Sequence, residues 1–155
     1  MHASTEPVRH GLTVSDLTLR IEKRIEIDAP LEVAFEAVLR EMGPDSTDED
    51  GDPMPLVLEP FPGGRWYRDT GNGTGHLWGH VQVIKPPRAL ELVGPMFMSY
   101  PVASHVRLAV EEGESGCVVT MLHTALGLIT DDHREGMDHG WSYTMTRIKE
   151  IAEGG

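Results

Sequence analysis

The stretch LTLRIEKRIEIDAPLEVAFEAVLREM, residues 17–42, decides the fold because its hydrophobic period changes once, near the middle. In the first half, apolar side chains occupy every second position from Leu17 to Ile27, and only Lys23 interrupts them. A period of two is typical of a β-strand with one buried face. We therefore predict a long, half-buried strand that stops at Asp28-Ala29-Pro30.

The second half of the stretch has the spacing of an amphipathic helix. Its apolar residues fall at i, i+4, i+7, i+8 and i+11, namely Leu31, Phe35, Val38, Leu39 and Met42. Pro30 suits a first helical position, and Glu32 favours the positive start of a helix. The spacing predicts about three helical turns that end at Gly43-Pro44.

The middle of the chain, from Pro55 to Leu126, alternates short apolar runs with glycine and proline breaks. The predicted strands cover residues 55–61, 64–70, 75–85, 88–94, 103–112 and 116–126. Glycines at 71, 73 and 75 could suggest a phosphate loop, but such a loop needs a helix directly behind it. A strand follows here, and Asn72-Gly73 is a familiar hairpin dipeptide, so we predict a hairpin.

A long helix is predicted at the C-terminal end. Thr130 is a good capping residue, and two aspartates follow it in the first turn. Apolar or aromatic positions then recur every three or four residues: His133, Met137, Trp141, Met145, Ile148 and Ala152. Such a helix has some 22 residues and a length of about 33 Å. Gly136 and Gly140 inside it indicate either a close approach of its backbone to the sheet or a ligand, or a local break.

These elements predict one α+β domain over residues 17–153, preceded by a flexible N-terminal arm, residues 1–16. Strands joined by short turns form an antiparallel sheet that needs a cover on its apolar face. Only the C-terminal helix is long enough to lie across it. We expect a curved sheet of about seven strands that grips this helix and leaves an apolar cavity between them.

The sequence also resembles the START-like superfamily (SRPBCC, Bet v 1-like helix-grip fold), in the branch related to activators of the heat-shock-protein-90 ATPase. The matching pieces are IEKRIEIDAPLEVAFEAV, PGGRW, WGHVQVIKPPRALEL, CVVTMLHTAL and HGWSYTMTRIKEI, in this order over residues 17–152. The chain departs from the family pattern at the acidic loop, residues 45–52, where the usual tryptophan is missing, and at Cys117, where threonine is common. The resemblance implies a hydrophobic cavity, with members that bind lipids or polyketides, act as cyclases or serve as co-chaperone domains.

The composition of the chain indicates which classes of binding partner and which cellular location to expect. The 155 residues carry 13 Lys and Arg against 25 Asp and Glu, a net charge of −12, which disfavours nucleic acid and anionic membrane surfaces. No apolar run reaches the roughly 20 residues of a membrane span, and the N-terminus lacks the apolar core of a secretory signal. The single cysteine, Cys117, cannot form an internal disulfide and suits a reducing cytoplasm, which is the location we expect.

The histidines and acidic residues do not predict a metal site or a cofactor. His76 and His80 would lie about 13 Å apart on one strand, too far for one zinc ion. His105 and His123 face each other only if paired residue numbers sum to 228, and a shift of one places them on opposite faces. In the acidic loop, an EF-hand register would put Val57 where a glutamate ligand is needed, so we expect a solvated loop.

The residues expected to line the cavity are aromatic, thioether or imidazole side chains: Trp66, Trp78, Tyr100, Met121, His123, Met137, Trp141 and Met145. No residue is assigned a catalytic role. His123 is equally a ligand-contacting residue and a structural histidine inside the sheet–helix interface, and a role as general acid or base ranks behind both. Arg68 and Arg107 could hold a ligand carboxylate or pair with acids on the outer sheet face.

The segment 94–101 is apolar for a loop between strands. Such a loop marks contact with a ligand, with a protein partner or with a second copy in a homodimer, and we prefer a lid over the cavity. The function that follows is binding of a small hydrophobic molecule, lipid or polyketide-like, of unknown identity. The alternatives are a co-chaperone-like interaction domain and a cyclase, dehydratase or hydrolase that uses His123.

Overall fold

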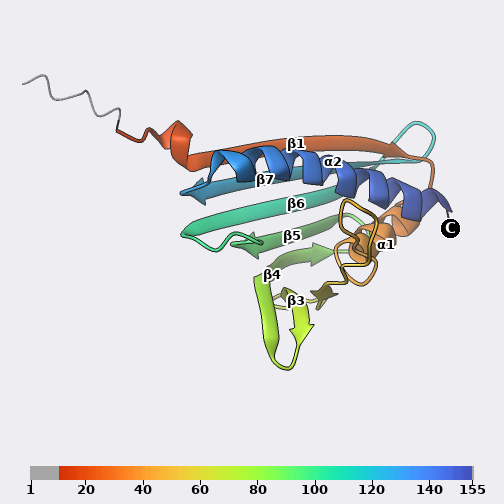
Figure 1. The fold of residues 1–155 in the computed structure, drawn as a ribbon. Coiled ribbons are helices and arrows are strands. Elements are labelled where there is room, and N and C mark those ends of the chain that lie inside the picture. Colours follow the sequence, from red (N-terminus) through yellow and green to blue (C-terminus); the bar gives the residue numbers. More distant parts are fainter. Residues whose placement is uncertain (1–10, 155) are drawn as a thin grey trace, which may run out of the picture.

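A computed structural model describes residues 11–154 of the chain. Its elements are a 3₁₀ turn η1 (Val14–Leu17), strand β1 (Thr18–Ile27), helix α1 (Leu31–Glu41), strands β2 (Val57–Leu58), β3 (Arg65–Gly71), β4 (Thr74–Lys85), β5 (Ala89–Gly94), β6 (Val102–Glu112) and β7 (Cys117–Gly127), and helix α2 (Asp131–Gly154). The strands form one antiparallel sheet in the order β1-β7-β6-β5-β4-β3-β2 (Figure 1). This arrangement confirms the predicted fold class.

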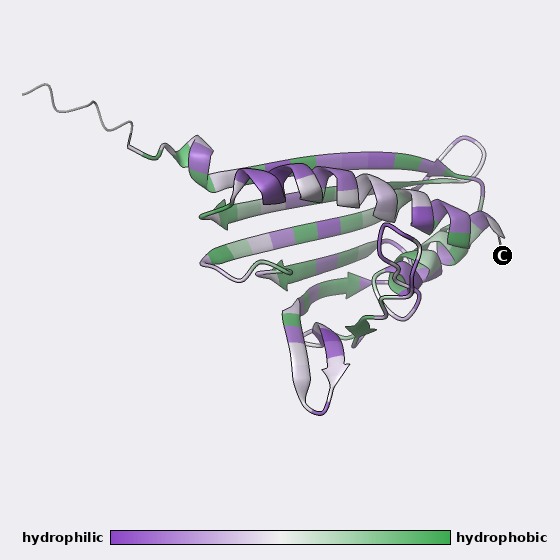
Figure 2. Ribbon diagram, viewed as in Figure 1, coloured by the Kyte–Doolittle hydropathy of each residue, from purple (hydrophilic) through white to green (hydrophobic). Residues whose placement is uncertain are grey.

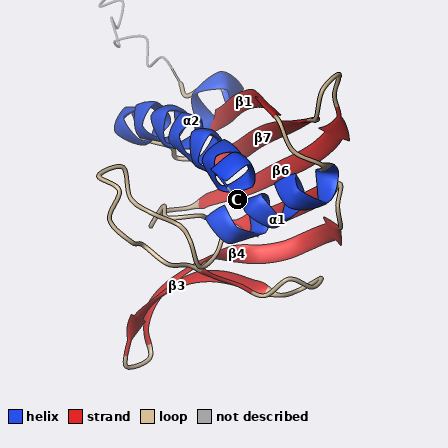
Figure 3. Ribbon diagram, turned by 90° about the vertical axis from the view of Figure 1, so that its right-hand side faces the viewer, coloured by secondary structure: helices blue, strands red, loops and turns tan. Residues whose placement is uncertain are grey.

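Both helices lie inside the curve of the sheet (Figure 3). Helix α2 runs along β1 and packs against it, and α1 contacts α2, β6 and β7. The hydrophobic core lies between the helices and the inner sheet face, which the alternating hydropathy of the strands creates (Figure 2). Within residues 11–154, neither helix combines the length and apolarity that crossing a bilayer requires.

Strand β1 shows why its apolar alternation is interrupted. Leu19, Ile21 and Ile27 are buried against the helices, as their period of two predicts. Lys23 lies on that same side, where its Nζ reaches Asp138 of α2 at 3.0 Å. Lys23 thus interrupts the apolar pattern because it forms an ion pair between the strand and the covering helix α2.

Most predicted strands agree with the structure to within one residue, but the strand expected over 55–61 is reduced to β2, Val57–Leu58. Pro55 and Pro60 flank β2 and lack the N–H that a sheet ladder needs. The Asn72-Gly73 hairpin is confirmed, since both residues have the positive φ angles, 56° and 75°, of a two-residue turn.

The structure also bears on three other predictions, which concern the start of α1, the continuity of α2 and the N-terminal arm. Pro30 occupies the N-cap of α1, one position before the helix begins. Helix α2 is continuous over 24 residues, so the break considered at Gly136 does not occur. Of the expected flexible arm, residues 1–10 lie outside the described residues, while Thr13 forms a capping box with Asp16 at η1.

Candidate functional site

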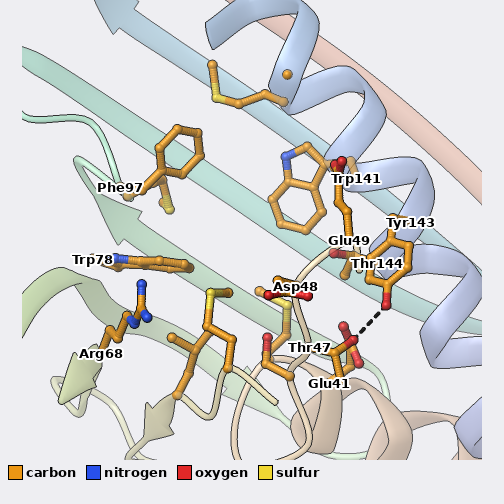
Figure 4. A pocket seen from close by; sticks show the side chains of 18 of the residues that line it. Glu41, Thr47, Asp48, Glu49, Arg68, Trp78, Phe97, Trp141, Tyr143 and Thr144 are labelled. Atoms are coloured by element: carbon orange, nitrogen blue, oxygen red, sulfur yellow. Dashed lines mark hydrogen bonds between the residues drawn. The ribbon is translucent and has the colours of Figure 1, made fainter. Parts of the chain in front are cut away.

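A cavity of about 430 Å³ lies between α2, the acidic loop, strands β3 and β4, and the segment after β5 (Figure 4). Sulfur and aromatic side chains form much of its surface, including Met54, Met96, Met137, Trp78 and Trp141. It lies beside the N-terminal half of α2, whereas α1 lies near the C-terminal half of that helix, where Glu41 meets Arg147 (Figure 1).

Trp66 and Trp78 form one wall of the cavity. Their rings meet edge to face with centroids 5.2 Å apart, and Phe97 continues the contact 6.2 Å from Trp78. The buried Trp66 is anchored because its indole N–H donates to the carbonyl of Met42 at 2.7 Å. The register between β3 and β4 slips at Trp66, leaving Trp78 without a partner on β3, and a bulge of this kind redirects a side chain.

Trp141 on α2 forms the facing wall and is held by a series of hydrogen bonds that runs through His123 to Ser104. Its indole N–H donates to Nδ1 of His123 at 3.0 Å, which fixes Nδ1 as an acceptor. The proton of the neutral imidazole therefore resides on Nε2, which donates to Oγ of Ser104 at 3.0 Å. Burial, with a smaller contribution from His105, lowers the pKa of His123 to about 4. His123 is neutral with both nitrogens engaged, so it positions Trp141.

His105 takes no part in the hydrogen bonds that join Trp141, His123 and Ser104. Strands β6 and β7 pair His105 with Thr124 and Val106 with His123, so paired residue numbers sum to 229 and the two rings lie on opposite faces. On the outer face, Nε2 of His105 lies 2.8 Å from Oε1 of Glu91. No group of three potential metal-ligating side chains occurs in the described part of the chain.

Gly136 and Gly140 leave two of the cavity-lining positions of α2 without a side chain. A Cβ atom added at Gly136 would meet nothing within 4 Å, and one at Gly140 would meet only Oε1 of Glu49 at 3.9 Å. The expected close approach of the helix backbone to the sheet is therefore wrong. Both glycines line the cavity, and the space beside them is open.

The segment 95–101, which we call the lid, closes one side of the cavity. Within the lid, Met96 and Met98 are buried and Phe97 remains 45% exposed, and both Met96 and Phe97 line the cavity. The Tyr100 hydroxyl lies 2.6 Å from Nδ1 of His133, and the two rings stack with centroids 5.5 Å apart. These contacts tie the lid to the first turn of α2.

The structure brings together five of the eight residues predicted to form the site. Those that line the cavity are Trp66, Trp78, His123, Met137 and Trp141. Tyr100 instead secures the lid, and Met121 and Met145 are buried in the core. Met145 lies one helical turn beyond Trp141, toward the half of α2 that α1 covers.

Residues 51–153 match the family described as Activator of Hsp90 ATPase homolog 1-like protein. The chain belongs to this family. The match confirms the resemblance drawn from the sequence, and solved structures of similar proteins agree with it.

The di-domain ARO/CYC StfQ from the steffimycin biosynthetic pathway has a TM-score of 0.62 at 14% identity; the match covers 91% of this chain and 51% of StfQ, so the chain spans about half of StfQ. An uncharacterized protein from Rhizobium leguminosarum has a TM-score of 0.67 at 15% identity, covering 89% and 96% of the two chains. CalU16 from Micromonospora echinospora has a TM-score of 0.58 at 18% identity, covering 88% and 74%. These likenesses establish the fold, and comparison with curated proteins finds no match.

The acidic loop, residues 45–52, was expected to be solvated, and this holds for its second half only: residues 49–52 are exposed, whereas Ser46 is buried. Ser46, Thr47, Asp48 and Glu49 line the cavity, and Oγ1 of Thr47 hydrogen-bonds the hydroxyl of Tyr143 at 2.7 Å. Oδ1 of Asp48 accepts from two backbone N–H groups of its own loop, at 3.0 and 2.9 Å. The loop composition carries no periodic signal that could have revealed this contact with α2.

Arg68 and Arg107, the two arginines considered as ligand contacts from the sequence, lie in different parts of the structure. Arg68 lines the cavity next to Trp78 and forms no ion pair with any residue from 11 to 154 (Figure 4). Arg107 is exposed on the outer face, in the same alternation as His105, and it too has no ion pair within that range. Neither arginine forms the expected ion pair in the described residues, although the sheet register places Glu91 opposite Arg107. Of the two, only Arg68 lines the cavity.

Glu41, the last residue of α1, is a further member of the cavity lining that sequence reasoning missed. Its side chain is buried, and Nε of Arg147 lies 3.4 Å from Oε2. That contact is too misaligned for a hydrogen bond, so both buried atoms lack a hydrogen-bond partner. Burial raises the pKa of Glu41 to about 8, although the nearby Arg147 guanidinium acts to lower it.

Proposed function

We propose that this protein binds a small, largely apolar molecule in the cavity between α2 and the sheet. The observation that carries the proposal is the bare helix surface at Gly136 and Gly140, which opens into a cavity of about 430 Å³ walled by tryptophans. Ligand sites in proteins have volumes of about 300–1,000 Å³ and combine apolar walls with a few polar groups.

The ligand would lie between Trp78 and Trp141, with the methionines adapting to its outline. The hydrogen bond from Trp141 to His123 holds one wall in place before the ligand arrives. A pre-positioned wall lowers the ordering cost of binding. The five residues Trp66, Trp78, His123, Met137 and Trp141 are the part of the sequence-predicted set that we retain for this role.

The lid would control access. Phe97 contributes to the cavity surface from the lid, and the Tyr100–His133 pair keeps the lid against α2. A ligand could enter when this pair opens. Met96 and Met98 of this segment are buried and so do not offer their side chains to a partner, which favours a lid over the alternative of a partner or homodimer surface.

Aromatic compounds are the first class to try, because the walls are aromatic and StfQ, which shares the fold, is described as an ARO/CYC protein of a biosynthetic pathway. A catalytic role for His123 receives no support from its geometry. A general base needs a free nitrogen within reach of the substrate, and both nitrogens of His123 already have partners within the protein.

A thermal-shift screen with fused-ring aromatics, flavonoids and fatty acids tests the proposal. A ligand at 100 times its Kd stabilises the folded state by about 2.7 kcal/mol, and raises Tm by about 5–10 °C for a chain of this size. The Gly140→Leu variant, whose side chain would occupy the cavity, should lose the rise. Ser142→Leu, at an exposed position of the same helix, should keep it.

A rise in Tm that persists unchanged in Gly140→Leu would show that the ligand binds elsewhere. No rise with any class would contradict the proposal and favour a role in contacts with proteins.

A further inference from the structure

The polar groups of the cavity are unevenly distributed. Glu41, Asp48 and Glu49 lie at the end near Tyr143, whereas Arg68 lies across the cavity beside Trp78 (Figure 4). The acidic end therefore has three carboxyl groups from α1 and the acidic loop. A ligand carboxylate placed there would be repelled, and an ammonium group would be attracted.

Glu41 distinguishes this end from an ordinary acidic surface. It is 3% exposed, lines the cavity, and has a buried Oε2 without a hydrogen-bond partner in the described residues. A buried polar atom left unpaired is costly, typically by about 1–3 kcal/mol. An unpaired buried polar atom in a folded protein calls for an explanation, and a bound molecule that donates to it is one.

Charged groups from α2 and the acidic loop surround Glu41. Arg147 and Glu150 approach it from α2, and Asp45 approaches it from the acidic loop. Arg147 also contacts Glu150 at 3.4 Å, so its charge is shared between two carboxyl groups. Asp45 has its own partner, Arg40, at 2.6 Å, so the guanidinium of Arg147 serves two carboxyl groups, Glu41 and Glu150.

We propose that the cavity selects a protonated amine carried on an aromatic or similarly apolar body, with the nitrogen held at Glu41. The inference rests on the proposed binding function and specifies its ligand class. An ammonium group has several N–H donors and can satisfy the unpaired oxygen of Glu41. The rings of Trp141 and Tyr143 line the same region and add cation–π attraction.

Proton exchange follows from the state of Glu41. With its pKa raised to about 8, the carboxyl group is mostly protonated at pH 7 in the empty cavity. Binding of an ammonium ion favours the carboxylate, so Glu41 gives up its proton to solvent as the amine enters. Amine affinity should therefore rise by about 25-fold between pH 6.5 and 8.5, in proportion to the ionised fraction of Glu41, while a neutral ligand shows no such rise.

Three probes with one ring system test the inference by titration calorimetry: 1-naphthaleneethylamine, 1-naphthaleneethanol and 1-naphthaleneacetate. The amine should bind about tenfold or more tightly than the alcohol, and the acetate most weakly. Titrations in buffers of different ionisation enthalpy should show proton release for the amine alone.

The variant Glu41→Gln keeps the shape of the side chain and removes its charge. It should lose the amine preference, the pH dependence and the proton release, while affinity for the alcohol stays within about twofold. The matched control is Glu49→Gln, which removes one charge from a side chain that is 55% exposed and should weaken amine binding only slightly.

The outcomes separate the two proposals. Equal binding of all three probes, or tightest binding of the acetate, would overturn the amine inference and leave the binding function standing. Amine preference that survives in Glu41→Gln would overturn the role of Glu41. If none of the three probes binds, the result would contradict the proposed binding of molecules of this size. The inference that the cavity selects amines would then fail as well.

Discussion

Replacing Gly136 and Gly140 with alanine should stabilise the protein and impair ligand binding at the same time. Glycine in a helix interior costs about 1 kcal/mol relative to alanine. The two added Cβ atoms would meet no backbone, since the nearest atom is Oε1 of Glu49 at 3.9 Å from Gly140. Nothing in the packing therefore offsets the gain.

The expected magnitude follows from these two positions. Each substitution should add about 0.4–1 kcal/mol to the free energy of unfolding, mainly by restricting the unfolded chain. The pair should add about 1–2 kcal/mol, because the two Cβ atoms share no contact. For a chain of this size the double variant should raise Tm by about 2–8 °C.

Differential scanning calorimetry measures the change in Tm, and calorimetric titration with the best ligand from the screen measures binding. Gly154→Ala, at the C-terminal end of α2, is the control and should change neither quantity by much, because helix ends contribute little. A lower Tm for the double variant would refute the reasoning, since it would mean that packed atoms occupy the space assigned to the cavity.

Four further predictions concern the hydrogen bonds that join Trp141, His123 and Ser104, the lid and the cysteine. Trp141→Phe leaves Nδ1 of His123 without its donor and should cost about 1–3 kcal/mol in urea unfolding; an unchanged midpoint would contradict the hydrogen bond. Because burial lowers the folded-state pKa of His123 to about 4 from 6.5, the unfolded chain binds the proton first, and stability present above pH 6.5 should decline by about 3 kcal/mol toward pH 4. Urea titrations across this range should show a shallower decline in His123→Gln. Tyr100→Phe removes the 2.6 Å contact with His133 and should speed both ligand association and dissociation in stopped-flow experiments; unchanged rates would argue against a gating lid. Burial raises the pKa of Cys117, so a thiol reagent should label the native protein far more slowly than the urea-unfolded chain, and equal rates would contradict its burial.

The fold was predictable from local patterns because each pattern reports a buried face. The alternation in β1 and the helical spacing in α2 identify which side of each element faces the core. Their order along the chain then restricts the topology to an antiparallel sheet with a covering helix. Lys23, which interrupts β1, became interpretable only when Asp138 was seen opposite it.

The relation of His105 to His123 could not be predicted, because it depends on a register shift of one residue. The sequence left two registers open: a sum of 228 for paired residue numbers, which places both rings on one face, and a shift by one, which separates them. In the structure Glu112 pairs with Cys117, so the sum is 229 and the two rings lie on opposite faces of the sheet. Composition of the connecting turn does not distinguish these registers.

The cavity lining was only partly predictable, because periodicity identifies a buried face and not what covers it. Met137 and Met145 lie on the same stripe of α2, yet one lines the cavity and the other is covered where α1 packs. The acidic loop contributes polar groups through a tertiary contact, Thr47 with Tyr143, which has no local signature. Glu41 was missed because it ends a helix whose pattern marks only apolar positions.

The most direct test of the binding function uses protein labelled with ¹³C at its methionine methyl groups and a bound aromatic ligand. The cavity-lining residues Met54, Met96 and Met137 should show nuclear Overhauser contacts to ligand protons. The core residues Met121 and Met145 should show none, since neither reaches the cavity. Contacts confined to the first group would support a ligand site between α2 and the sheet, whereas contacts absent from that group would contradict it.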